Sequence, residues 1–132
     1  MSDDEFVVHA IGIVRASLSD VTNAPKQGSE GAPDAWIEVD LRFADGLRDI
    51  AVGDPLIVLS WMHLADRATL SVHPRDDERV PMRGVFGTRS ASRPNPIGLH
   101  DVTVRAREGA RLRVGPIELV DGSPIVDIKP AL

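Results

Sequence analysis

Hydrophobic and polar positions in the first half of the chain either alternate with a period of two or form short apolar runs. Both patterns are typical of β-strands. Residues 36–43 alternate, which indicates a half-buried strand. Residues 56–62 form a continuous apolar run whose length and β-branched content favour a buried strand over a helix. An apolar-rich segment over residues 7–17 is predicted to be the first strand.

The second half continues this strand-and-turn pattern. Residues 102–107 and 110–114 predict a hairpin, and residues 117–120 and 124–128 predict another. Only residues 62–71 and 44–51 have a pattern that could hold a short helix. Turns are expected at Asp45-Gly46 and at Gly53-Asp54-Pro55, and long loops over residues 18–35 and 74–83. The pattern predicts one all-β domain over residues 1–132, folded as a barrel or a sandwich.

Length and composition set further limits. A chain of 132 residues that is 42% hydrophobic buries a core without covalent cross-links. The absence of cysteine excludes thiol catalysis, zinc–thiolate sites and disulfides. The four histidines have no ligand spacing, so no metal is expected. An acidic N-terminus and the lack of an apolar run near 20 residues lead us to expect a cytoplasmic protein without a membrane span.

Charge is distributed unevenly along the chain. The net charge of −5 argues against bulk electrostatic binding to nucleic acid. Residues 1–66 hold 4 Lys and Arg against 12 Asp and Glu, whereas residues 67–132 hold 11 against 8. Ten of those eleven cations are arginine, which suits bidentate contacts with carboxylates and phosphates. Any anion site is therefore expected in the second half.

The stretch Gly84–Leu99 (GVFGTRSASRPNPIGL) concentrates the candidate chemistry. Pro94 and Pro96 fix their own φ angles and push the residues before them towards extended backbone. The result is a stiff loop that carries Arg89, Arg93 and several neutral hydrogen-bonding side chains. Such a loop suits a polar ligand, because its ordering entropy is already lost before binding. The same residues also fit a purely structural connection whose arginines cap carbonyls or pair with carboxylates.

This stretch closely resembles the signature of the TsaA/TrmO-like family of S-adenosylmethionine-dependent tRNA methyltransferases. Three further stretches resemble the family in the same order along the chain: residues 11–17 (IGIVRAS), 25–27 (PKQ) and 121–130 (DGSPIVDIKP). The resemblance therefore spans nearly the whole chain.

The resemblance implies a small single-sheet β-barrel with long loops, S-adenosyl-L-methionine as cofactor, and a homodimer with the cofactor near its interface. It also implies tRNA as a partner, methylated at N6 of threonylcarbamoyladenosine. The cofactor-binding positions that it carries over are Pro25, Lys26, Gln27, His63, Leu64, Arg89, Leu99, Asp121, Gly122 and Ser123.

No catalytic residue is assigned. The sulfonium already activates the methyl group, so the protein need mainly align it with a nucleophile. Asp121, Asp127 and His63 are the candidates if a base exists. A lone histidine after an apolar strand is more often structural, and Asp127 is two residues from Lys129, with which it would pair on the same face.

Departures from the family pattern leave the methyl acceptor open. Gly87 and Ala91 replace the usual residues of the signature, Leu64 stands where the tRNA enzymes usually have Gln, and no Tyr follows Pro130. The chain ends at Leu132, where larger bacterial tRNA enzymes continue into a further domain. Another RNA, a small molecule, or a non-catalytic S-adenosylmethionine-binding module are the alternatives.

The evidence for an RNA surface is divided. Four arginines at positions 105, 107, 111 and 113 are expected on the outer face of one hairpin. They form either a phosphate-contacting patch or an ordinary solvated face that protects an edge. Trp61 and Phe86 are expected to be buried, which leaves few aromatic side chains for stacking on bases.

Overall fold

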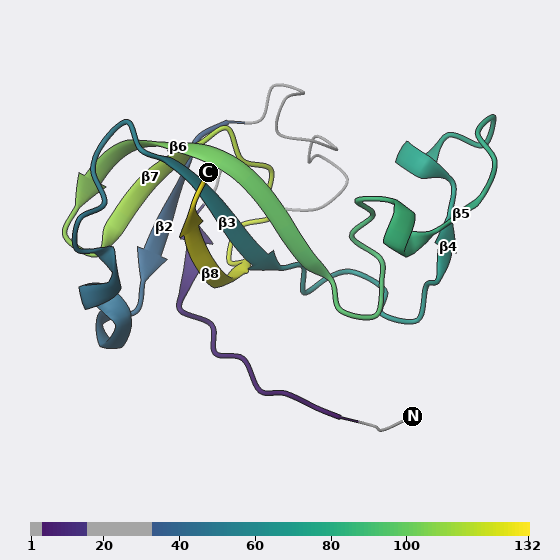
Figure 1. Cartoon of the computed structure of the whole chain (residues 1–132), viewed down its shortest axis with the longest axis horizontal. Helices are drawn as coiled ribbons and strands as arrows, with labels where there is room; N and C mark the ends of the chain where they lie inside the picture. Colours follow the sequence, from purple (N-terminus) through teal and green to yellow (C-terminus); the bar gives the residue numbers. More distant parts are fainter. Residues whose placement is uncertain (1–3, 16–32) are drawn as a thin grey trace.

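The computed structural model describes residues 4–15 and 33–132, and within them six antiparallel strands close into one barrel (Figure 1). Their order around the barrel is β1-β2-β7-β6-β3-β8. The strands are β1 (Gly12–Arg15), β2 (Ala35–Val39), β3 (Pro55–Trp61), β6 (Ile97–Glu108), β7 (Arg111–Gly115) and β8 (Pro124–Pro130). The prediction of a small single-sheet β-barrel is confirmed.

The barrel interior is filled by alternate side chains of every strand, as the period of two requires. Val14, Ile37, Val58, Leu112 and Ile125 are each fully buried in one core cluster. At Gly12 the backbones of β1 and β2 approach so closely that a Cβ atom would lie 2.4 Å from the Glu38 carbonyl oxygen. Only glycine permits this register.

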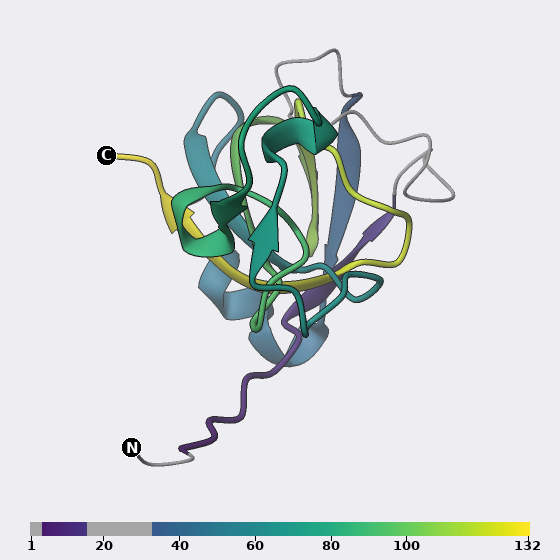
Figure 2. The same ribbon diagram turned by 90° about the vertical axis from the view of Figure 1, so that its right-hand side faces the viewer.

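Residues 62–96 leave the barrel between β3 and β6, and we call this segment the arm. It contains a two-stranded sheet of β4 (Ser71–Val72) and β5 (Arg83–Gly84), with the short 3₁₀ helices η4 (Pro74–Asp76) and η5 (Val85–Gly87). Figure 1 shows the arm standing off one end of the barrel, and Figure 2 looks onto the arm from that side. Residues 62–71, whose pattern allowed a short helix, form none: Asp66 Oδ1 accepts a hydrogen bond from the Ala68 amide, a turn that competes with helix formation.

Two other element predictions were wrong in part. The second strand ends at Val39, and residues Leu41–Leu47 form the 3₁₀ helix η3, because the Asp40 carboxylate caps it by accepting from the Arg42 amide at 2.9 Å. The expected Asp45-Gly46 turn lies inside this helix. Residues 117–120 are not a strand, because both edges of β8 are already paired, with β1 and with β3.

Other turns agree with prediction. Gly53 adopts a φ of 97° just before β3, and Gly109 adopts a φ of 58° at the turn of the β6–β7 hairpin. Along residues 4–15 and 33–132, no helix has both the length and the apolar character needed to cross a bilayer.

Candidate functional site

The barrel topology brings most of the candidate residues to one end of the barrel. Strands β1, β3 and β7 finish at this end, and β2, β6 and β8 begin there. His63 and Leu64 directly follow β3, Leu99 lies near the start of β6, and residues 121–123 lead into β8. We call this the arm end of the barrel, because the arm leaves from it (Figure 2). The candidates Pro25, Lys26 and Gln27 lie outside the described residues.

The candidates at the arm end fall into an exposed group and a buried one. His63, Leu64 and Leu99 are all solvent-exposed. Leu99 points outwards from β6, where its partner across the sheet is Leu59 on β3. Asp121 and Ser123 flank a turn at Gly122, whose φ of 85° favours glycine.

That turn is tied firmly to the barrel. The Ser123 hydroxyl is buried and donates to the Val120 carbonyl at 2.7 Å. The Gly122 amide donates to the Val14 carbonyl at 2.7 Å, and the Val14 amide donates back to the Ser123 carbonyl at 2.9 Å. Asp121 remains exposed, with Oδ2 3.8 Å from Arg15 Nη1. Ser123 is therefore structural through its side chain, and Asp121 is the accessible polar group of the three.

The two arginines of the signature stretch have different roles. The Arg93 guanidinium turns back into its own loop, where it donates to the carbonyls of Val85 and Thr88. The Arg89 guanidinium is exposed and makes no hydrogen bond or ion pair with the rest of the described chain. The structural interpretation therefore holds for Arg93, which caps carbonyls of its own loop. The N–H donors of Arg89 have no partner in the described chain and are available to a ligand.

A third arginine, which sequence reasoning did not single out, braces the same loop from outside. Arg67 donates through Nε to the Pro94 carbonyl at 2.7 Å and through Nη2 to Asn95 Oδ1 at 3.2 Å. Its guanidinium lies 5.0 Å from the centre of the Trp61 ring. Since Trp61 ends β3, Arg67 couples the proline-rich loop to the barrel and fixes the segment that leads to Leu99.

A buried polar pair lies inside the barrel at the arm end. Ser60 on β3 and His100 on β6 share a hydrogen bond of 2.9 Å between Oγ and Nε2, and both side chains are buried. Burial lowers the pKa of the His100 imidazole to about 4, although the nearby Asp101 carboxylate acts in the opposite direction. His100 is therefore neutral at pH 7. Only the strand pairing brings these residues together.

A second group missed from the sequence is Glu118, in the segment before the Gly122 turn. It was assigned to a strand that does not form. Burial raises the pKa of its carboxyl to about 7, while the Arg75 guanidinium in the arm acts in the opposite direction. A charged residue between the buried Ile117 and Leu119 was the available signal.

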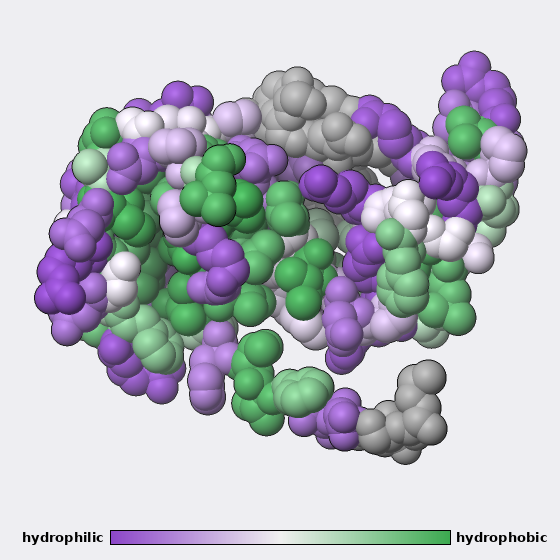
Figure 3. Space-filling model, in the orientation of Figure 1, coloured by the Kyte–Doolittle hydropathy of each residue, from purple (hydrophilic) through white to green (hydrophobic). Residues whose placement is uncertain are grey.

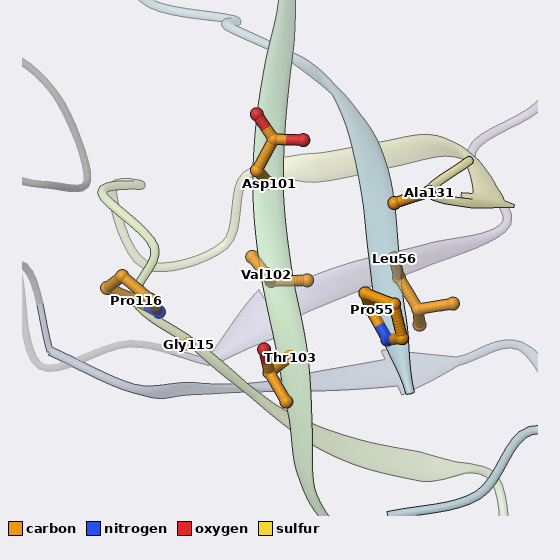
Figure 4. A pocket seen from close by; sticks show the side chains of 8 residues that line it. All are labelled: Pro55, Leu56, Asp101, Val102, Thr103, Gly115, Pro116 and Ala131. Carbon is orange, nitrogen blue, oxygen red and sulfur yellow. The ribbon is translucent and has the colours of Figure 1, made fainter. Parts of the chain in front are cut away.

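Two hollows in the described part of the chain are lined by none of the candidate cofactor-binding residues at the arm end. One, of about 240 Å³, lies over β3 and β6 beside the chain's last residues (Figure 4). Asp101 lines it two residues beyond Leu99 on the same strand face, and Pro55 at the start of β3 and Ala131 after β8 line it as well. The other, of about 370 Å³, lies beneath η3 at the opposite end and includes Asp127.

The Asp127 side chain makes local contacts, as expected if its role is structural and not catalytic. Its Oδ2 pairs with Lys129 Nζ at 2.9 Å and its Oδ1 accepts from the Ile128 amide at 2.9 Å. It also lies away from the arm end, beside η3. Asp127 is therefore not part of the site that the other candidates form.

Arg105, Arg111 and Arg113 lie on the outer face of the hairpin as expected, but the expectation was wrong for Arg107. A β-bulge between Val104 and Ala106 places Arg107 opposite the buried Leu112, on the core side of the sheet. Each of the four arginines already has a partner. Arg105 and Arg113 lie 3.7 and 3.6 Å from the Asp34 carboxylate. Arg107 donates to the carbonyls of Leu47 and Ile50, and Arg111 stacks over Trp36. These contacts favour a structural face over a phosphate-binding patch.

The expectation of buried aromatic side chains was wrong for Phe86, which is 81% exposed. The η5 turn directs Val85 inwards and its neighbour outwards. Trp61 is only half-buried.

Comparison with known proteins identifies close relatives. Residues 13–132 match the sequence profile of the tRNA-methyltransferase O N-terminal domain. A protein of Archaeoglobus fulgidus named a probable S-adenosyl-L-methionine-binding protein is 42% identical over 91% of this chain, and one of Methanothermobacter thermautotrophicus with the same name is 38% identical over 98%. A crystal structure of TrmO from Pseudomonas aeruginosa superposes with a TM-score of 0.77 at 28% identity, covering 99% of this chain.

The lengths of these proteins differ. The chain spans 93% of the Methanothermobacter relative, but only 32% of the Archaeoglobus relative and 56% of the TrmO structure.

Proposed function

Because this chain belongs to the family of the tRNA-methyltransferase O N-terminal domain, we propose that it binds S-adenosyl-L-methionine at the arm end of the barrel and transfers its methyl group. The relatives that are 38–42% identical to this chain are named as S-adenosyl-L-methionine-binding proteins. The reaction type is that of the family's tRNA methyltransferase.

The observation that carries this proposal is the state of Arg89. The loop around it is held by Arg93 from within and by Arg67 from outside, and the Arg89 guanidinium is still exposed with no partner in the described chain. A fixed loop that presents a permanent cation suits the carboxylate of S-adenosylmethionine. Leu99 and Asp121 at the same end supply an apolar surface and a hydrogen-bond acceptor for the rest of the molecule.

This role of Arg89 is tested by calorimetric titration of S-adenosylmethionine. We expect micromolar affinity for the unaltered chain, on the order of −8 kcal/mol. Arg89→Ala is expected to weaken binding at least about tenfold, because it removes a charge-assisted hydrogen bond. Arg79→Ala is the matched control, since Arg79 is an exposed arginine of the same arm that pairs with Asp77. Equal affinities of the two variants would refute the role of Arg89.

We propose N6 of threonylcarbamoyladenosine in tRNA as the methyl acceptor, with another RNA or a small molecule as the alternative within the same reaction. Incubation with tRNA that lacks the methyl mark, followed by nucleoside analysis, tests this acceptor. The expected result is conversion that requires S-adenosylmethionine. Cofactor binding without transfer to tRNA would rule out this acceptor. Cofactor binding without transfer to any candidate acceptor would support a binding module, which is the function that the relatives' names state.

We further propose that the chain forms a homodimer through the arm. Leu64, Leu70, Met82 and Phe86 of the arm are all more than half exposed, and Figure 3 shows apolar side chains gathered there. Apolar surface of this kind marks interaction sites on soluble domains.

Phe86→Glu is expected to convert this dimer to a monomer, because it places a charge in the apolar surface of the arm. Sedimentation equilibrium measures the mass directly. The matched control is Leu41→Glu, which alters an equally exposed residue on η3 at the other end of the barrel. A dimer that survives Phe86→Glu, or a monomeric unaltered chain, would contradict this arrangement.

A further inference from the structure

Glu118 occupies an unusual position in the segment that joins β7 to β8. Its neighbours Ile117 and Leu119 are only 1% and 2% exposed and anchor the segment in the core. Glu118 itself is half-buried, three residues before Asp121 at the arm end of the barrel. A carboxylate in such surroundings loses part of its hydration and needs compensating contacts.

Those contacts are incomplete. Glu118 Oε2 is shut off from solvent and has no hydrogen-bond partner in residues 4–15 and 33–132, where it is the one buried side-chain oxygen or nitrogen in that state. Nearly all buried polar groups in native folds have a hydrogen-bond partner, so one without a partner needs a physical explanation. An acceptor oxygen without a donor is the complement of a ligand that carries N–H or O–H groups.

Burial and the neighbouring Arg75 side chain both affect the charge of the Glu118 carboxyl, and so the charge of a ligand that would bind it. Burial favours the neutral carboxyl, and Arg75 of η4 is the charged side chain whose field favours the ionised form. Arg75 and its neighbour Asp76 both have positive φ, 56° and 58°, a backbone region that non-glycine residues seldom adopt. Such strain tends to occur where a fold has to hold a functional group in place. Even with Arg75 near, Oε2 keeps a free acceptor site.

We infer that Glu118 is a ligand-binding residue that receives the ammonium group of the methionyl part of S-adenosylmethionine. This inference rests on the proposed function and adds a residue that the family signature did not supply. An ammonium group provides both a positive charge and three N–H donors, which are the two things that the carboxylate lacks. The sulfonium carries charge but no N–H donor, so it does not complete the hydrogen bonding of Oε2.

The first test compares S-adenosylmethionine with S-adenosylhomocysteine, which keeps the ammonium group and has no sulfonium charge. Glu118→Gln is expected to weaken the binding of both by about 10- to 100-fold, the range for a hydrogen bond between charged groups. Glu108→Gln is the matched control, because Glu108 is an exposed glutamate in the β6–β7 turn that pairs with Arg111. It is expected to leave both affinities unchanged.

The second test counts protons. A carboxyl with a pKa of about 7 is half protonated at pH 7, and an ammonium partner lowers that pKa and displaces the proton. Titration at pH 7 in buffers of different ionisation enthalpy should show about 0.5 more protons released by the unaltered chain than by Glu118→Gln. A merely structural glutamate would not produce this difference.

The outcomes separate this inference from the proposed function. If the unaltered chain binds neither compound, the proposed function itself fails. If it binds both and Glu118→Gln binds them equally well, or loses affinity for S-adenosylmethionine alone, Glu118 does not receive the ammonium group. Thermal unfolding guards against a folding defect: Glu118→Gln should melt no lower than the unaltered chain, since it removes a poorly solvated charge.

Discussion

Gly98→Ala is expected to destabilise the barrel by about 3 to 5 kcal/mol, because the added methyl group has no room beside a buried polar pair. A Cβ atom at this position would lie 2.5 Å from Ser60 Oγ, 2.8 Å from His100 Nε2 and 3.2 Å from Met62 Sδ. The methyl group would overpack the barrel and also separate the buried Ser60–His100 pair, which leaves polar atoms without partners. Urea unfolding followed by tryptophan fluorescence measures the loss.

Two comparison variants make this prediction specific. Gly46→Ala adds the same methyl group within η3, where no atom lies within 4 Å, and should change stability by less than about 0.5 kcal/mol. Adding Ser60→Ala to Gly98→Ala removes the nearest clashing atom and should recover part of the loss. A Gly98→Ala protein as stable as the Gly46→Ala protein would show that the pair is not packed as the structure has it.

The second large effect is a loss of stability in acid that depends on His100. The imidazole has a pKa of about 4 in the folded protein because it is buried, against 6.5 when the chain unfolds. Between these values the unfolded state binds the extra proton, so stability is fully present above about pH 6.5 and falls as the pH drops towards 4. At pH 4.5 the loss should reach about 2 to 3 kcal/mol relative to pH 7.5.

His100→Gln isolates this effect, because glutamine is polar but does not titrate. The stability difference between the unaltered chain and the variant should move by about 2 to 3 kcal/mol in favour of the variant from pH 7.5 to pH 4.5. Glu118 acts in the opposite sense: its raised pKa stabilises the fold below about pH 4.5, and that contribution is lost as the pH rises to about 7. Both proteins contain Glu118, so its contribution to the pH dependence of stability cancels in the difference between them. A difference that does not change with pH would mean that His100 is solvated.

Much of the barrel could be predicted because its strands follow simple alternation. The run over residues 56–62 and the hairpin around Gly109 were correctly identified from pattern and turn chemistry alone. The errors arose where a side-chain contact or the pairing of other strands overrode the sequence pattern. Asp40 caps a 3₁₀ helix in the middle of an alternating segment, and residues 117–120 have no free strand edge on β8 to pair with.

The candidate site was predictable only in part, because several of its contacts join residues that only the folded chain brings together. The signature stretch marked a rigid loop, but sequence could not tell that Arg93 would turn inwards while Arg89 stays exposed. Ser60 and His100 are 40 residues apart and meet only because β3 pairs with β6. Glu118 becomes notable only when its unpartnered oxygen is seen in three dimensions.

The central claim is that the arm end of the barrel is the cofactor site, and a crystal structure of the chain with S-adenosylhomocysteine tests it most directly. The expected result is ligand density at that end, with its carboxylate on Arg89, its ammonium group on Glu118 and its remaining atoms against Leu99 and Asp121. Density in the hollow beneath η3, or a ligand that touches neither Arg89 nor Asp121, would contradict the claim.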